Sequence, residues 1–109
     1  MRTMTELKKT LTVGAEFEII DAHRAETIGQ IRRVNFANTQ GIYTIIPAEP
    51  NSKVTKGNGG KGSYLDWKSA KYWRFKEDNI VAAYNSAEAH TRDTLIIEFK
   101  VLKGGERLK

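Results

Sequence analysis

Apolar and polar residues alternate with a period of two in several short segments of the chain, and this pattern constrains its fold most. The segment 94–101 places four apolar residues on one face, namely Leu95, Ile97, Phe99 and Val101. In 15–20, Phe17 and Ile19 face one way, while the glutamates beside them face the other. A period of two is typical of half-buried β-strands, so we expect a mainly β chain.

Further segments with strand character are separated by turn residues. We expect strands in 27–37, 41–46, 65–67, 71–76 and 79–84, with hairpin turns at 38–41 and 77–79. The alternation in 27–37 slips between Ile31 and Val34, which predicts a β-bulge near Arg32 and Arg33 that bends the strand. Gly41 is expected to supply a positive φ in the first turn.

The N-terminus predicts one short helix over 4–11. Thr3 and Glu6 have the spacing of a capping box, and the apolar residues of this segment share a face that would cover a core. The predicted architecture is a small, strongly bent antiparallel sheet or a partly open barrel with a short N-terminal helix. It is mainly β, with α+β at the margin.

The length of 109 residues predicts a single domain spanning 1–109. Within it, 47–63 is almost free of apolar residues and predicts a long, basic, glycine-rich loop, and about 103–109 predicts a frayed tail. The chain has no cysteine, which excludes disulfides and thiolate chemistry. It has no apolar stretch of signal-peptide or membrane-span length. We therefore expect a cytoplasmic protein with no membrane partner.

Positive charge is concentrated in one central segment. Residues 1–50 hold six basic and six acidic residues, and 77–109 hold five basic and six acidic ones. The segment 51–76 carries seven basic residues and one acidic residue, a net charge of +6, against +5 for the whole chain. A concentrated basic stretch is typical of polyanion binding, although small proteins are often basic for solubility alone.

The glycines of this segment do not form a nucleotide-binding motif. A P-loop requires Gly-Lys-Ser/Thr with another glycine five residues earlier, opening a helix. The residue five before Gly60 is Thr55, Gly62 follows Lys61, and the next segment is strand-like. The backbone amides and lysines of this loop can still attract an anion, and a mobile, lysine-rich hairpin loop is the simpler interpretation.

Aromatic and basic residues are interleaved directly after the glycines. Five of the ten aromatic residues lie within twelve positions: Tyr64, Trp67, Tyr72, Trp73 and Phe75. Basic side chains on the backbone and rings against the bases are the usual means of holding single-stranded nucleic acid. Trp73 and Phe75 are expected in the core. For Tyr64, Tyr72 and Arg74, surface stacking and packing remain equal alternatives.

These features define a candidate nucleic-acid surface. Its members are Lys53, Lys56, Lys61, Tyr64, Lys68, Tyr72, Arg74 and Lys76. Outside it, Arg32 and Arg33 point to opposite faces of a strand unless a bulge intervenes. At least one therefore projects to solvent, where it would either join the basic surface or pair with Glu16 or Glu18 on the neighbouring strand. We expect the pairing, because adjacent antiparallel strands bring such charges opposite each other.

Enzyme chemistry has little support in the sequence. His23 and His90 are the only histidines, and neither has enough nearby ligands for a metal site. Ser86, His90 and Asp93 have the residue types of a hydrolase triad, but a triad is defined by geometry and not by proximity in sequence. We expect no catalytic residues, no metal and no cofactor.

Two stretches resemble small uncharacterised proteins of bacterial phages and other mobile elements. The matching residues are Gly14, Gly41, Leu65, Trp67, Ala70 and Phe75. The chain departs from that pattern at Lys68, where such sequences tend to have proline. The resemblance implies a mobile-element setting and no particular activity.

The leading hypothesis is therefore a non-enzymatic module that binds DNA or RNA without strong sequence preference. The alternative is a protein-interaction or assembly module of a mobile element. Such a module would form homo-oligomers by pairing of a sheet edge between chains.

Overall fold

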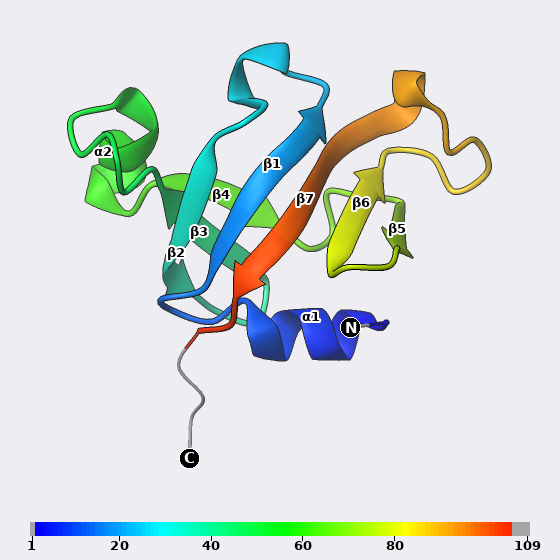
Figure 1. Cartoon of the computed structure of the whole chain (residues 1–109), viewed down its shortest axis with the longest axis horizontal. Coiled ribbons are helices and arrows are strands. Elements are labelled where there is room, and N and C mark those ends of the chain that lie inside the picture. Colours follow the sequence, from blue (N-terminus) through cyan, green and yellow to red (C-terminus); the bar gives the residue numbers. More distant parts are fainter. Residues whose placement is uncertain (1, 106–109) are drawn as a thin grey trace.

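The computed structural model describes residues 2–105, and its main feature is one antiparallel sheet (Figure 1). The strands are β1 (Glu16–Ala22), β2 (Ile31–Ala37), β3 (Gly41–Ile45), β4 (Ser63–Asp66), β5 (Tyr72–Phe75), β6 (Ile80–Tyr84) and β7 (Leu95–Lys103). The helices are α1 (Met4–Thr10) and α2 (Lys53–Gly60), with short 3-10 turns η1 (Ala25–Thr27) and η2 (Arg92–Thr94). The strand order is β4-β3-β2-β1-β7-β6-β5. The predicted mainly β fold is confirmed, and the sheet is open, with β4 and β5 as its edges.

The sheet is strongly bent, which brings its two edges toward each other. In Figure 1, β3 and β4 pass behind β1 and β2. The connection between β4 and β5 carries Trp67, whose ring lies 5.8 Å from that of Trp73 on β5. The Trp73 indole Nε1 also donates a hydrogen bond to the Trp67 carbonyl oxygen, at 3.2 Å. These contacts hold β5 against the connection that follows β4, and β4 and β5 are not paired in the strand order.

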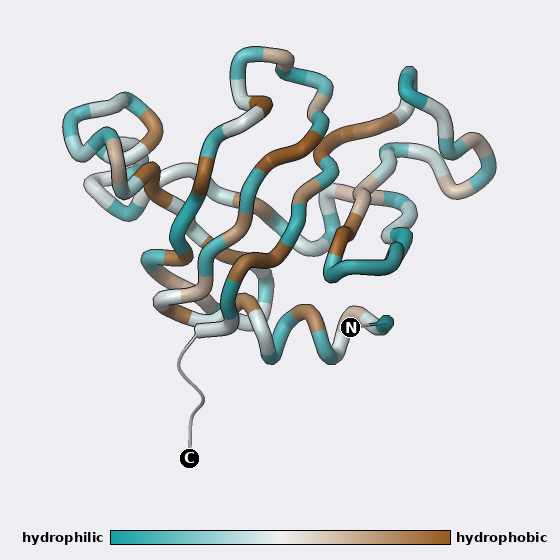
Figure 2. Tube along the Cα trace, viewed as in Figure 1, coloured by the Kyte–Doolittle hydropathy of each residue, from teal (hydrophilic) through white to brown (hydrophobic). Residues whose placement is uncertain are grey.

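The core fills the inner face of the bent sheet, and α1 packs against it. Its largest fully buried side chains are Phe17, Phe99, Leu7, Leu11, Ile19, Ile42, Val34 and Val81. Figure 2 shows apolar and hydrophilic residues alternating along α1 and along the strands, as this arrangement requires. The Thr3 hydroxyl accepts a hydrogen bond from the Glu6 amide at 3.2 Å, so the predicted N-terminal cap is confirmed.

The predicted strand 27–37 is wrong in its first part and in the position of its bulge. Residues 25–27 form η1, and β2 begins at Ile31. The register shift lies between Val34 and Phe36, not at Arg32 and Arg33. The four-residue apolar face of β7 is also divided by a register shift, between Ala83 and Tyr84. Because of this shift, Leu95 packs in a separate cluster with Ala82 and Tyr84.

The predicted glycine-rich loop over 47–63 is wrong in its centre, because it contains α2. The Ser52 side chain caps this helix by accepting from the Thr55 amide at 3.0 Å. The helical path is interrupted at residues 57–59, where the backbone leaves helical angles. The predicted frayed tail also begins too early, because β7 continues to Lys103 and the Gly105 amide donates to Thr10. Residues 106–109 lie outside the described part.

Glycine is needed at position 41 for a different reason from the one predicted. The φ angle of Gly41 is not positive. A Cβ atom at this position would lie 2.2 Å from the Leu65 carbonyl oxygen on β4. Gly41 is therefore required by the close approach of β4 to β3.

Within residues 2–105, no helix has the length and apolar character needed to cross a membrane.

Candidate nucleic-acid interface

Three aromatic rings lie side by side across β2, β3 and β4. Phe36 is paired with Tyr43 in the sheet register, and Tyr43 is paired with Tyr64. Their ring centroids are 5.8 Å apart for Phe36 and Tyr43 and 4.7 Å apart for Tyr43 and Tyr64. Phe36 is 41% exposed and Tyr64 38% exposed, and Tyr43 is half-buried between them. We call these three residues the aromatic ladder.

The bulge in β2 is what turns Phe36 outward. Arg32 and Val34 are buried on the inner face, so simple alternation would also place Phe36 there. The register shift after Val34 inserts one extra residue, and Phe36 then pairs with Tyr43 on the outer face. Ala37 in turn packs against the core. A ring that alternation assigns to the core is therefore exposed.

Lys61 lies over the ladder. Its Nζ atom is 5.3 Å from the centre of the Phe36 ring and 5.7 Å from that of Tyr43, within the range of a cation–π interaction. The Asn35 side-chain amide, at the bulge, donates to the carbonyl oxygens of Gly60 and Lys61 at 3.4 and 3.3 Å. The bulge thus exposes Phe36 and also binds the segment that carries Lys61.

The glycine-rich segment is folded, and it positions Lys61. The Gly62 amide donates to the Gly57 carbonyl at 2.8 Å. The side chain of Asn58, a residue in the left-handed region, donates to the Gly62 carbonyl at 2.7 Å. These bonds fold the chain between α2 and β4 into a compact turn.

Two further lysines of the predicted site, Lys53 and Lys56, lie exposed on α2. The helix is attached to the end of β3 by the Thr55 hydroxyl, which accepts from the Ile46 amide at 3.0 Å and donates to its carbonyl at 3.2 Å. Lys53, Lys56 and Lys61 form no ion pair with any residue in 2–105. Their charge is therefore available to an external anion.

Partial burial, with a contribution from the nearby Asp66 carboxylate, raises the pKa of the Tyr64 phenol above its ordinary value of 10.0. The ring therefore stays uncharged at neutral pH. An uncharged ring suits stacking against a base beside an anionic backbone.

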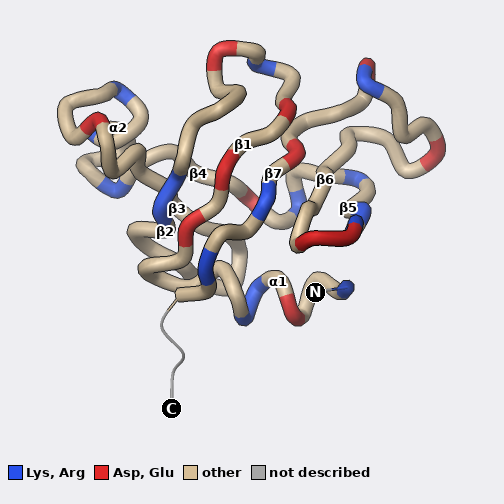
Figure 3. The backbone as a smooth tube through the Cα atoms, in the orientation of Figure 1, with Lys and Arg blue, Asp and Glu red and all other residues tan. Residues whose placement is uncertain are grey.

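The other predicted residues lie elsewhere. Tyr72, Arg74 and Lys76 lie on or directly after β5, at the opposite end of the strand order from β4, and Lys68 is exposed on the connection between these strands. Figure 3 shows the basic residues of α2 and those near β5 as two separate groups. The structure thus divides the predicted site.

The β5 group is engaged within the protein. The Tyr72 ring stacks on His90, with centroids 3.8 Å apart and planes at 11°, so one of its faces is covered. Lys76 forms an ion pair with Glu98 at 3.2 Å. Only Arg74 is left exposed on β5 without such a contact in the described chain.

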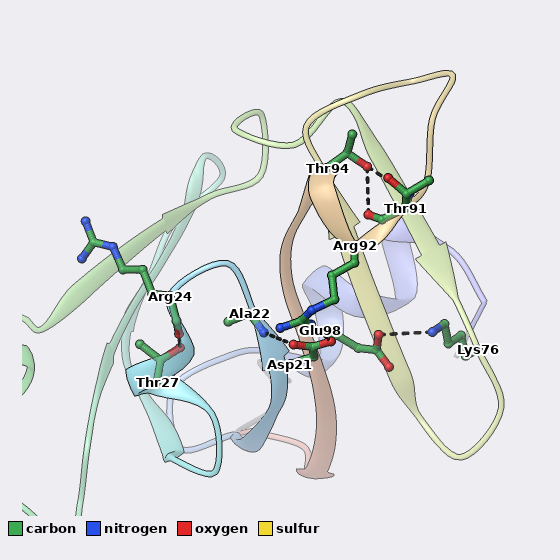
Figure 4. A network of polar contacts seen from close by, with 9 residues as sticks. All are labelled: Asp21, Ala22, Arg24, Thr27, Lys76, Thr91, Arg92, Thr94 and Glu98. Atoms are coloured by element: carbon green, nitrogen blue, oxygen red, sulfur yellow. Dashed lines mark hydrogen bonds and ion pairs between the residues drawn. The ribbon is translucent and has the colours of Figure 1, made fainter.

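Acidic residues beside this group also pair with basic ones. Figure 4 shows Arg92 directed at Asp21 and Lys76 directed at Glu98, and the two acidic residues lie on the neighbouring strands β1 and β7. The ion pair and hydrogen bond from Arg92 lower the pKa of the Asp21 carboxyl below its ordinary value of 3.8. Lys76 and Arg92 are therefore paired with acidic side chains, whereas Lys53 and Lys56 of α2 have no acidic partner within residues 2–105.

Sequence reasoning identified part of the ladder and missed the rest. Tyr64 was predicted, and the expectation that Trp73 and Phe75 pack against the core is confirmed. Tyr43 was missed, although alternation in 41–46 places it opposite the buried Ile42 and Thr44. Alternation in 27–37 does not predict an exposed Phe36, because the bulge after Val34 reverses the direction of its side chain. The predicted pairing of Arg33 with Glu16 is confirmed, at 2.8 Å.

The described residues contain no group of three or more His, Cys, Asp or Glu side chains arranged to hold a metal ion. His90 lies against Tyr72 and Tyr84, and His23 lies on the connection after β1.

The fold and this surface define the class of the molecule as a small, open, antiparallel β-sheet protein with an exposed aromatic ladder. Comparison with known proteins finds no family model, no curated protein and no solved structure that matches the chain.

Proposed function

We propose that this protein binds single-stranded nucleic acid, without strong sequence preference, over the aromatic ladder and the lysines beside it. The observation that carries the proposal is the row of three exposed or half-exposed rings under Lys61, which has no ion pair in the described part of the chain. Stacking of bases on aromatic rings tolerates any sequence, because every base has a π-face. The unpaired lysines would contact the phosphates. The function is binding, with no catalytic step.

The lysine positions support a path for the strand. Lys61 lies over Phe36 and Tyr43, and Lys53 and Lys56 lie on α2, which packs beside β3 and β4. A strand whose bases lie on the ladder would therefore have cations along one side. The β5 residues are secondary in this proposal, because Tyr72 and Lys76 are engaged with His90 and Glu98.

The direct test is fluorescence anisotropy with labelled oligonucleotides of about 15 nucleotides. Single-stranded DNA, single-stranded RNA and duplexes would be compared at low salt. We expect the single strands to bind more tightly than the duplexes, because a paired base cannot lie on a ring. Absence of binding to every oligonucleotide at low salt would exclude the proposal.

Substitution of the middle ring gives a sharper test. We expect Tyr43→Ser to weaken single-strand binding at least about fivefold, since one base stack contributes about 1–3 kcal/mol. Tyr72→Ser is the control, because Tyr72 is also a tyrosine on the sheet but lies against His90 on β5, away from the ladder. Circular dichroism would confirm that both variants are folded. Equal losses of affinity from the two substitutions would contradict the assignment of the binding site to the ladder.

The alternative of an assembly module rests on a different observation, the unpaired edges of β4 and β5. The phage or mobile-element setting implied by the resemblance, and a cytoplasmic location, are compatible with either proposal.

A further inference from the structure

A cavity of about 490 Å³ opens on the inner side of the bent sheet. Apolar side chains form much of its wall, among them Phe17, Ile19, Leu65 and Ile97. Val54 of α2 and residues of the connection between β1 and β2 contribute the remaining sides. No residue of α1 lines it, and Figure 1 shows α1 and the β1–β2 connection at opposite ends of the sheet. One end of the interior is thus filled by core, and the other is hollow.

A buried arginine lies in this wall. Arg32 is 7% exposed, although most arginines keep their charge in water. Its Nε and Nη2 atoms donate to the Gln30 side-chain oxygen at 2.9 and 2.7 Å, and Nη1 donates to the Thr44 hydroxyl at 3.1 Å. These three bonds use three of the five N–H groups of a guanidinium. All of the acceptors are neutral.

Among the residues that the structure describes, no acidic side chain pairs with this guanidinium. Arg32 forms no ion pair within residues 2–105, and neither Asp nor Glu is among the residues that line the cavity. The other charged or titratable residues of the wall are Arg24, His23 and the Tyr64 phenol, so the lining has only positive or neutral groups. Buried charges are normally paired, because an isolated one is costly to remove from water.

Burial lowers the pKa of the Arg32 guanidinium below its ordinary value, yet an arginine side chain stays protonated in proteins. The cavity therefore presents a fixed positive charge beside apolar walls. Its neighbour in sequence, Arg33, shows the contrast, because it lies on the outer face and pairs with Glu16.

We propose that this cavity binds a small amphipathic organic anion, with its carboxylate or phosphate group on Arg32 and its hydrocarbon body against the apolar wall. The guanidinium matches the geometry of both anionic groups, and the cavity volume is in the range of small-molecule sites. Arg24 and His23 on the wall would add attraction for the anion. This site lies on the inner side of the sheet and shares Tyr64 with the ladder, whereas Phe36 and Tyr43 do not line it. The proposal rests on Arg32 and the apolar wall and does not depend on nucleic-acid binding.

The first experiment compares three probes that share one hydrocarbon chain: octanoate, octyl phosphate and neutral 1-octanol. Each is titrated into the ¹⁵N-labelled wild-type protein while amide shifts are recorded by NMR. We expect at least one of the two anions to shift amides of the cavity lining and to bind at least about tenfold more tightly than octanol. The stronger anion identifies the head group. Failure of both anions to bind, or octanol binding as tightly as they do, would overturn the proposal.

The second experiment removes the charge. Arg32→Met keeps an unbranched side chain without the guanidinium, and Arg33→Met is the matched control on the outer face. We expect Arg32→Met to weaken anion binding at least about tenfold and Arg33→Met to leave it unchanged. Unchanged affinity in a folded Arg32→Met variant would show that Arg32 only links β2 to β3 through Thr44, which overturns the proposal.

A third variant applies if Arg32→Met does not fold. Val54 is half-buried on α2 and lines the cavity without bonding to Arg32. Val54→Trp should fill the opening and abolish anion binding while the protein stays folded. Wild-type affinity in this variant, or shifts confined to the exposed lysines of α2, would likewise overturn the proposal.

Discussion

Gly62, where α2 gives way to β4, is a residue that no other amino acid can replace without strain. Its φ is +102°, and a Cβ atom would lie 2.0 Å from the Thr44 carbonyl oxygen of β3. The Gly62 carbonyl accepts a hydrogen bond from the Asn58 side chain, and the Gly62 amide donates one to the Gly57 carbonyl. These two bonds fold the turn before β4. The orientation of Lys61 over the ladder therefore depends on this one position.

We expect Gly62→Ala to lower the free energy of unfolding by about 3 kcal/mol, because it combines a disfavoured φ with a backbone clash. Gly59→Ala is the control: its φ is also positive, at +70°, but its Cβ would meet nothing within 4 Å. The free energy of unfolding of that variant should fall by only about 1 kcal/mol. Urea denaturation measures the free energy of unfolding of both variants. Equal losses would show that the backbone clash at Gly62 does not contribute.

The ion pair between Asp21 and Arg92 gives a pH-dependent contribution to stability. The pKa of Asp21 is lower in the folded protein than its ordinary value of 3.8, so the stabilisation is present above 3.8 and is lost as the pH falls through the folded pKa. Because both side chains are partly exposed, water screens the pair and its contribution at neutral pH is expected to be small.

We therefore expect Arg92→Met to lower the Tm slightly at pH 6, with the difference from wild type disappearing toward about pH 2. Arg24→Met is the control, since Arg24 makes no ion pair within the described residues. Thermal unfolding across this pH range is the measurement. A difference in Tm that grows as the pH falls would contradict the prediction, because a carboxyl group with a lowered pKa loses its stabilising effect on acidification.

At the scale of elements, α2 and the bulge of β2 assemble the candidate interface. The helix arises where the sequence predicted a loop, because Ser52 caps it and Thr55 attaches it to the end of β3. The bulge turns Phe36 outward and allows Asn35 to bind the segment that carries Lys61. Neither element adds much to the main core, and both place groups on the outer surface.

If the α2 lysines contact phosphates, replacing them should change the salt dependence of binding. We expect Lys53→Gln with Lys56→Gln to reduce the slope of log affinity against log salt by about 1.4, or about 0.7 for each lost contact with a single strand. Lys8→Gln with Lys9→Gln on α1 is the control, because it removes two exposed lysines and leaves the same net charge. An equal change in slope from the α1 pair would show that only net charge matters.

At the scale of the whole molecule, the open sheet separates two basic groups and leaves two edges. Both edge strands are only four residues long, and short edges limit pairing between chains. Trp67, on the connection that follows β4, also packs on Trp73 of β5.

We therefore expect a monomer in solution, measured by size-exclusion chromatography with light scattering. A stable dimer would favour the assembly alternative. In that case, proline substitution at Leu65 on β4, compared with the same change at Arg74 on β5, would identify the edge that pairs.

The sequence by itself determined the local features of this protein. Alternation predicted the inward side chains of β1 and most of β7, Thr3 predicted the start of α1, and the excess of positive charge was placed in one segment. Each of these depends on residues close together in the chain, where the period of two or the spacing of a cap acts directly.

Only the tertiary structure decided which residues meet. The aromatic ladder joins Phe36, Tyr43 and Tyr64 through strand register, and a one-residue shift in β2 is enough to expose Phe36. The same pairing buries Arg32 beside a cavity and sends the two halves of the basic segment to opposite ends of the sheet. Register, bulges and strand order follow from the packing of residues distant in sequence, so no local pattern could specify them.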